Sequence, residues 1–169
     1  MGIFDITWNL FKRVGYFLNA GGNWVLRKLF PTDKKGWLDE TKNGLNSRQE
    51  ILFRDSVSCE LVKDDTGKIT IKGVWKCKYT NEVFTDPTRI EIDHIVPVAY
   101  ARANKLGVWT PRKWAAFYND FENLKAIEGK TNSSKRDKPL NKWLPPHNQK
   151  WYKSQFKKVC RKWWIRIPK

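Results

Sequence analysis

Two adjacent residues, Asp93 and His94, carry side chains that together can support phosphodiester hydrolysis. They lie toward the end of a stretch, 90–96, that is rich in β-branched residues and is followed by Pro97. This pattern predicts a strand. Successive side chains on a strand point to opposite faces, so Asp93 can ligate a metal while His94 addresses a nearby water. Phosphodiester cleavage needs a base for that water and a cation for the charge on the phosphate, and this pair supplies the base and a first metal ligand.

An adjacent Asp and His on a strand is also the pattern of a structural hydrogen bond, so further residues must support the chemistry. A hard ion such as Mg²⁺ keeps several waters, and one aspartate oxygen and one asparagine oxygen are sufficient protein ligands. Glu91 and Glu122 are alternative carboxylates for such an ion. His147, the only other histidine, lies in a proline-rich loop and is expected to be structural.

Around this pair the chain resembles the HNH, or ββα-metal, nuclease superfamily. Residues 93–97 look like the first strand of that motif, Asn123 its central asparagine, and residues 132–135 the part of its helix that bears an asparagine, here Asn132. The nine-residue step from Asn123 to Asn132 is similar to that of the HNH domain in RNA-guided DNA nucleases.

A closer resemblance is to a branch of this superfamily in small bacterial and phage nucleases and in restriction enzymes directed at modified DNA. The similarity covers roughly residues 73–146. Its landmarks are Gly73-Val74-Trp75, Tyr79-Thr80, residues 92–97, a helix at 109–119, Asp120, Asn123-Leu124, Asn132, Lys135 and Trp143-Leu144-Pro145.

The resemblance implies a role for each site residue. His94 would activate water as general base, and Asp93 and Asn132 would bind one Mg²⁺ or Mn²⁺ ion per site. Asn123 would orient the loop that bears His94 by hydrogen bonding. Asn119 is a rival for the central asparagine, but its place at the end of a predicted helix favours a capping role.

The charge of the chain indicates a polyanionic partner. Thirty-three Lys and Arg stand against seventeen Asp and Glu, a formal net charge of +16. A surface this basic binds nucleic acid in a salt-dependent way, because neutralising phosphates releases counterions. Double-stranded DNA is the predicted partner. An anionic membrane is the competing one, but no apolar stretch is long enough to span a bilayer, so stable membrane insertion is not expected.

Two basic segments are the candidate DNA contacts. The first follows Asn132 and the second lies in the C-terminal tail, where aromatic and basic residues alternate. The candidates are Lys135, Arg136, Lys138, Lys157, Lys158, Arg161 and Lys162. The alternatives are a solvated basic helix face for the first segment and core packing of the aromatic residues for the second.

The helices and strands that we expect around these residues make up an α+β fold with a ββα-metal core. We expect a helix from Ser47, capped through Glu50, and a hairpin formed by residues 59–62 and 68–79. Strands at 90–96 and 123–127, helices at 98–105 and 110–118, and a short helix at 130–136 follow. The predicted domains are an N-terminal helical segment and linker (1–46), the nuclease domain (47–146) and a basic aromatic tail (147–169) that forms a helix.

The three cysteines form no C-x-x-C pair, so neither a zinc knuckle nor a disulfide framework is indicated. With no secretory leader pattern, we predict a cytoplasmic protein of a bacterial or phage-infected cell. The predicted function is that of a metal-dependent DNA endonuclease or nickase. Two other functions compete with it: a non-catalytic DNA-binding protein that retains the fold, and a membrane-active basic protein. The presence of Asp93, His94 and Asn132 together favours the enzyme.

Overall fold

The structure, a computed structural model, describes residues 37–39, 42–63, 65–67 and 69–169 of the chain. The predicted N-terminal helical segment falls on residues 1–36, outside this part. The α+β fold class is confirmed. The elements run in the order α3 (Ser47–Asp55), β1 (Ser56–Lys63), β2 (Ile69–Lys76), β3 (Val83–Phe84), the 3₁₀ helix η1 (Pro87–Arg89), β4 (Ile90–His94), α4 (Val98–Asn104), α5 (Pro111–Tyr118), β5 (Leu124–Glu128), α6 (Gly129–Lys135) and α7 (Gln149–Trp163).

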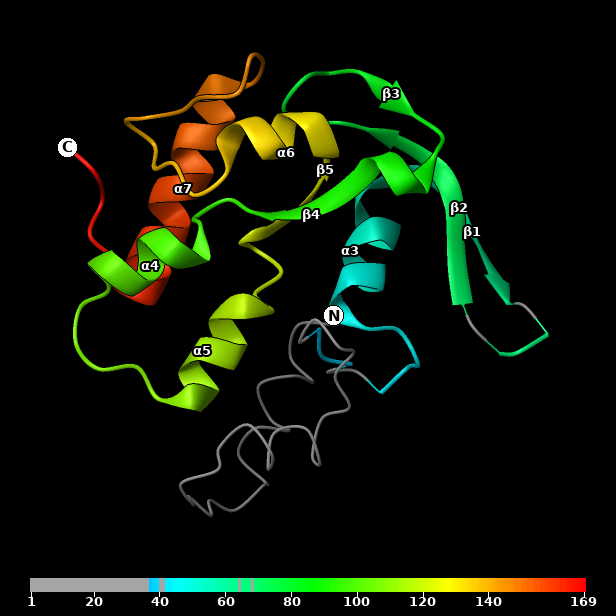
Figure 1. The fold of residues 1–169 in the computed structure, drawn as a ribbon, viewed down its shortest axis with the longest axis horizontal. Helices are drawn as coiled ribbons and strands as arrows, with labels where there is room; N and C mark the ends of the chain where they lie inside the picture. Colours follow the sequence, from blue (N-terminus) through cyan, green and yellow to red (C-terminus); the bar gives the residue numbers. More distant parts are fainter. Residues whose placement is uncertain (1–36, 40–41, 64, 68) are drawn as a thin grey trace, which may run out of the picture.

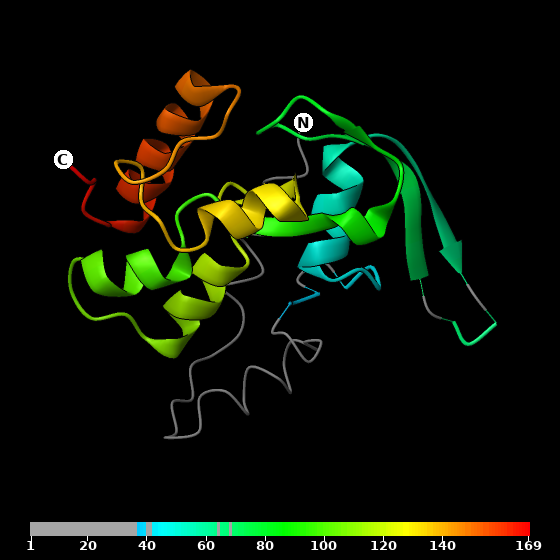
Figure 2. The same cartoon turned by 45° about the horizontal axis from the view of Figure 1, so that its top comes forward.

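Strands β4 and β5 and helix α6 form the unit that carries the predicted site. The strands pair antiparallel, with His94 opposite Leu124 and Ile90 opposite Glu128. Helix α6 follows β5 directly, and the Glu128 side chain caps it by accepting from the backbone N–H of Thr131 at 2.8 Å. The helix lies along this small sheet in both views (Figures 1 and 2). The predicted strand, strand, helix arrangement is therefore confirmed.

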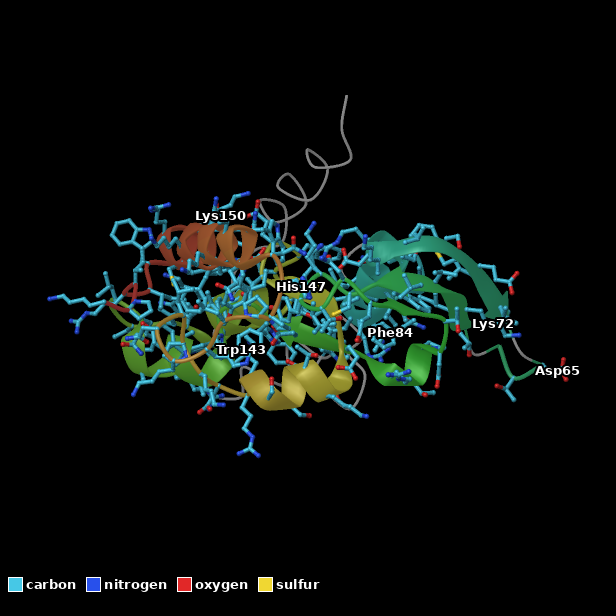
Figure 3. All side chains as sticks on the ribbon, turned by 90° about the horizontal axis from the view of Figure 1, so that it is seen from above. Asp65, Lys72, Phe84, Trp143, His147 and Lys150 are labelled. Carbon is cyan, nitrogen blue, oxygen red and sulfur yellow. The ribbon has the colours of Figure 1, made fainter. Side chains whose placement is uncertain are left out.

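A second sheet contains the predicted hairpin. Strands β1 and β2 pair antiparallel on either side of a turn at Asp65–Gly67, and the short strand β3 adds to β2. The hairpin projects from the molecule at the end opposite to α7 (Figure 1). The labelled Asp65 and Lys72 mark this end in the view from above (Figure 3). β3 was not expected from the sequence, because two residues are too few to show a periodicity.

Helix α3 begins at Ser47, as predicted, but its capping box lies one residue earlier than expected. The side chain of Asn46 accepts a hydrogen bond from the backbone N–H of Gln49, and the side chain of Gln49 accepts one from the backbone N–H of Asn46. The prediction of Ser47 and Glu50 as the box was wrong. Ser47 instead donates its hydroxyl to the Leu38 carbonyl at 2.8 Å, which ties the start of α3 to the described segment before it.

The far end of α3 is fixed to strand β5. Arg54 donates to the carbonyl oxygens of Phe121 and Leu124 at 2.6 and 2.7 Å. Asp55 accepts from Lys125 at 2.7 Å and from the backbone of Ala126 at 2.9 Å. Bonds to charged groups contribute about 1.5–3 kcal/mol each, so α3 holds the strand that pairs with the site-bearing strand β4.

The core continues through helix α7. Its inward face is fully buried at Tyr152, Phe156, Val159 and Cys160, and the Tyr152 hydroxyl donates to the Ile95 carbonyl at 3.3 Å. The core is thus continuous across the predicted domain boundary at residue 147, and α7 packs as part of the folded domain. Core packing, the alternative for the tail aromatics, holds for these two aromatic residues.

Candidate active site

A pocket opens beside strand β4, between this strand, the start of α4 and the end of α6. It brings together four of the residues predicted from the sequence: Asp93, His94, Asn132 and Arg136. Its full lining is Glu91, Ile92, Asp93, His94, Pro97, Val98, Ala99, Asn132, Ser133, Arg136 and Asp137. Residues that bear carboxylate, amide, imidazole and guanidinium groups therefore line one pocket.

The imidazole of His94 has a defined tautomer. Its Nε2 lies 2.8 Å from the backbone carbonyl oxygen of Tyr118. A carbonyl oxygen only accepts, so Nε2 must carry the proton and donate. In the neutral ring Nδ1 is then the basic nitrogen. His94 is thereby oriented as a proton acceptor through one named atom.

Aromatic rings surround the His94 side chain. Trp37 stacks on it with ring centroids 6.0 Å apart and an interplanar angle of 11°, and Tyr118 lies 4.8 Å away. Burial lowers the pKa of His94, against the opposing effects of the Tyr118 carbonyl and the Asp93 charge. The ring is therefore neutral at pH 7. The sequence interpretation missed Trp37, which it placed in a polar linker; a tryptophan in such a segment was the available signal.

Asn123 holds the chain immediately after His94. Its buried side chain accepts from the Val96 backbone N–H at 2.8 Å and donates to the Val96 carbonyl at 3.3 Å. Its own carbonyl accepts from the N–H of Ile95 at 2.8 Å. The predicted hydrogen bonding of Asn123 to the His94 loop is present. The rival, Asn119, lies at the end of α5 and donates its side-chain amide to the carbonyl of Ala115 at 3.0 Å.

Asp93 is buried and accepts two strong hydrogen bonds. Its Oδ1 lies 2.7 Å from the Nζ of Lys135, and its Oδ2 accepts from the Tyr79 hydroxyl at 2.6 Å. Burial and the Asp93 charge raise the pKa of Tyr79 well above its usual range, so Tyr79 stays a donor. The same Nζ donates to the His94 carbonyl at 2.8 Å. These bonds fix the Asp93 carboxylate against both α6 and the segment after β2.

The position of Lys135 corrects one prediction. We expected Lys135 on an exposed basic face that contacts DNA, but its side chain is 0% exposed. It lies on the side of α6 that faces β4, where Asp93 requires a counter-charge. Lys135 is therefore an internal cation of the site and not a surface contact.

Asn132 is oriented by Glu91. The Asn132 Nδ2 donates to Glu91 Oε2 at 2.8 Å. Because a carboxylate only accepts, this bond fixes the amide so that Oδ1 is the atom left for another partner. Glu91, one of the two alternative carboxylates, thus lies at the pocket. The other, Glu122, pairs with Lys158 and Lys162 at 2.9 and 3.2 Å.

The donor set of the pocket suits a hard cation. Among the described residues no group of three or more His, Cys, Asp or Glu is arranged to hold a metal ion. Asp93, Asn132 and Glu91 line the pocket together, and each carboxylate oxygen can accept more than one partner. One or two carboxylates, an amide and several waters make up a common magnesium environment, so these residues fit Mg²⁺ or Mn²⁺.

The basic residues near the end of α6 differ in environment. Arg136 lines the pocket and adopts φ of 52°, a conformation that favours glycine. Such backbone strain costs on the order of 1–3 kcal/mol and is concentrated at functional sites. Lys138 is exposed and donates to the Ser134 carbonyl at 2.8 Å. Arg136 is thus the cation placed at the pocket itself.

Helix α7 carries two kinds of basic residue. Lys158 and Lys162 are in ion pairs, with Glu122 and Asp120 at 2.9 and 2.7 Å. An exposed stripe along the helix consists of Lys150, Lys153, Lys157 and Arg161. Within the described part of the chain none of these four forms an ion pair. Figure 3 labels Lys150 on α7, at the edge of the molecule opposite to α6. The predicted DNA-binding set of the tail is thus split between paired and unpaired cations.

The fold and the pocket define a class: an α+β domain in which an oriented histidine lines a pocket together with carboxylate and amide residues, a set of groups suited to general acid–base chemistry. Over residues 46–161 the chain matches the family described as "GmrSD restriction endonucleases, C-terminal domain". This is more than half of its 169 residues, and the chain belongs to this family. The printed description of this family names restriction endonucleases.

A fungal protein is similar to part of the chain. The chain is 29% identical over 108 residues to a protein of Arthroderma benhamiae described as an uncharacterized secreted protein, and the match covers 63% of this chain and 52% of the relative. The chain thus spans about half the length of that relative.

The predicted cytoplasmic location of the chain stays a prediction. No solved structure matches the chain, and among the described residues no helix is both long and apolar enough to cross a membrane.

The split of the α7 cations generates a prediction about DNA binding. Replacing both Lys157 and Arg161 with alanine should weaken binding to duplex DNA. The slope of the logarithm of the association constant against the logarithm of the salt concentration should become shallower by up to about 1.8, because each phosphate contact contributes about 0.9. The matched control replaces Lys158 and Lys162, whose charges are already compensated, and should change the slope less. Fluorescence anisotropy at several salt concentrations measures both. A slope for the Lys157 and Arg161 variant equal to that of the wild type would show that the stripe is only a solvated face.

Proposed function

We propose that this domain is a metal-dependent endonuclease or nickase of the HNH type that hydrolyses DNA phosphodiester bonds, with His94 as general base. The observation that carries this proposal is the bond from His94 Nε2 to the Tyr118 carbonyl, which leaves Nδ1 as the basic nitrogen of a residue that lines the pocket together with Asp93 and Asn132. Membership in a family of restriction endonuclease domains supports DNA as the substrate.

The first chemical task of the chain is to remove a proton from the attacking water. A base works at neutral pH only if it is unprotonated, and burial among Trp37 and Tyr118 keeps His94 in that state. The Tyr118 carbonyl also stabilises the ring after protonation, since Nε2 then continues to donate while Nδ1 holds the new proton. Asn123 keeps the loop after His94 in place during this transfer.

Asp93 and Asn132 would hold the divalent ion, with Glu91 orienting Asn132. A bound Mg²⁺ or Mn²⁺ supplies positive charge to the phosphate and the leaving oxygen. Arg136, which lines the pocket, would bind a phosphate oxygen. The net charge of +16 supports attraction of the duplex as a whole.

Supercoiled plasmid tests the proposal. The wild-type protein should convert it to open-circular or linear DNA with Mg²⁺ or Mn²⁺ present and should stop when a chelator is added. His94→Ala should lower the cleavage rate on the order of 10²–10⁴-fold, the usual effect of losing a positioned base. DNA binding by this variant should persist, because its basic surface is unchanged.

Three outcomes would contradict the proposal. Undiminished cutting after thorough chelation would remove the metal from the mechanism. A folded His94→Ala variant with near-normal activity would show that another group is the base. Binding without any cleavage by the wild-type protein would favour a DNA-binding protein that retains the fold.

The burial of His94 also determines the pH profile. A protonated imidazole cannot accept a proton, so activity falls as the pH drops through the pKa of His94. This pKa lies below its ordinary value of about 6.5, and the acid limb of kcat/KM should therefore be centred below pH 6.5. Trp37→Ala admits water to the ring and should move the limb toward higher pH. Rates measured from about pH 4.5 to 8 at saturating metal test this; a limb centred above 6.5 in the wild type would be inconsistent with a buried base.

A further inference from the structure

The ion pair between Asp93 and Lys135 is the most deeply buried pair of charges in the described part of the chain. Its side chains are 5% and 0% exposed, and the charged atoms are 2.7 Å apart. Burying two charges is costly, and replacing such a pair by apolar residues is often neutral or stabilising. Stability alone therefore gives little reason for this pair, and its location in the pocket is the feature to explain.

The Asp93–Lys135 ion pair lies where the divalent metal ion is proposed to bind, so the metal would be a second cation beside Asp93. Asp93 lines the pocket together with Glu91 and Asn132, yet its charge is already compensated from the α6 side by an ammonium. Tyr79 donates to the other oxygen at 2.6 Å and brings no charge. Each carboxylate oxygen keeps a further lone pair, so a cation entering from the pocket would share Asp93 with Lys135.

We propose that Lys135 is an internal counter-ion that substitutes for the metal when the site is empty. It compensates the buried Asp93 carboxylate, so that the domain folds without a metal, and it weakens the binding of the divalent ion by repelling it. This inference rests on the proposed function, because it requires a metal to bind at Asp93. Lys135 is thus a positioning residue, not a ligand of substrate or metal.

Replacing the ammonium with an isosteric apolar chain separates this role from a structural one. In chelator, Lys135→Met leaves Asp93 uncompensated, and the melting temperature should fall on the order of 10 °C. Adding Mn²⁺ should restore much of this loss, because the ion supplies the missing charge. Calorimetric titration should show Mn²⁺ affinity on the order of tenfold or more above wild type, since a nearby like charge has been removed.

Two further variants make the comparison specific. Lys130→Met, on the exposed side of the same helix, should leave both the melting temperature and the Mn²⁺ affinity unchanged. The double variant Asp93→Asn with Lys135→Met removes both charges, and it should be more stable in chelator than Lys135→Met and gain nothing from Mn²⁺. If Lys135→Met does not fold in chelator, refolding with and without Mn²⁺ gives the same readout.

The possible failures can be told apart. If the wild type binds Mn²⁺ and cleaves plasmid, but Lys135→Met is destabilised equally with and without Mn²⁺ and binds it no more tightly, the counter-ion role is overturned and the proposed function survives. If neither protein binds Mn²⁺, both proposals are overturned. Restoration of Lys135→Met by Mn²⁺, absent in the double variant, supports the counter-ion role.

Discussion

The ammonium of Lys135 ties helix α6 to the end of strand β4, and the geometry of the site depends on that contact. One nitrogen binds the side chain of Asp93 and the carbonyl of His94, the two residues expected to do chemistry. The amide of Asn123 holds the following residues from the β5 side. The short strand therefore ends in a position fixed from two directions, and a base and a carboxylate on successive residues keep a constant separation. Preorganisation of this kind is what a hydrolytic site requires.

The rest of the fold supports these two attachments. Helix α3 fixes β5 through Arg54 and Asp55, and β5, which begins directly after Asn123, is the partner of β4. Helix α7 completes the core from the other end of the molecule. The family match begins at the cap of α3 and ends within α7, so the region shared with restriction endonuclease domains coincides with the elements that hold the site.

Much of this arrangement could be predicted from the sequence, because it depends on local patterns. A β-branched run stopped by Pro97 located β4, and Thr110 followed by Pro111 located the start of α5. The strand, strand, helix order then placed Asp93, His94 and Asn132 close to one pocket. The hydrogen bonding of Asn123 was expected from the resemblance and not from any periodicity.

Other features depend on contacts between distant residues and could not be predicted this way. Lys135 stands in a polar, basic stretch that looks solvent-exposed, and only the buried Asp93, 42 positions away in sequence, explains its inward orientation. Trp37 contacts His94 although the two residues are 57 positions apart in sequence (94 − 37). The α7 lysines look equivalent in sequence, but Asp120 and Glu122 neutralise two of them. Charge patterns identify a partner class, while tertiary pairing decides which charges are available to it.

The central claim is that a divalent ion binds beside His94 through Asn132, whereas Asn123 only positions the loop. Calorimetric titration of Mn²⁺ into Asn132→Ala and Asn123→Ala, each confirmed to be folded, tests it most directly. The account predicts that Asn132→Ala loses affinity on the order of tenfold or more, and that Asn123→Ala binds Mn²⁺ like the wild type while its turnover falls. Loss of Mn²⁺ affinity in Asn123→Ala with normal affinity in Asn132→Ala would contradict the assignment of the site.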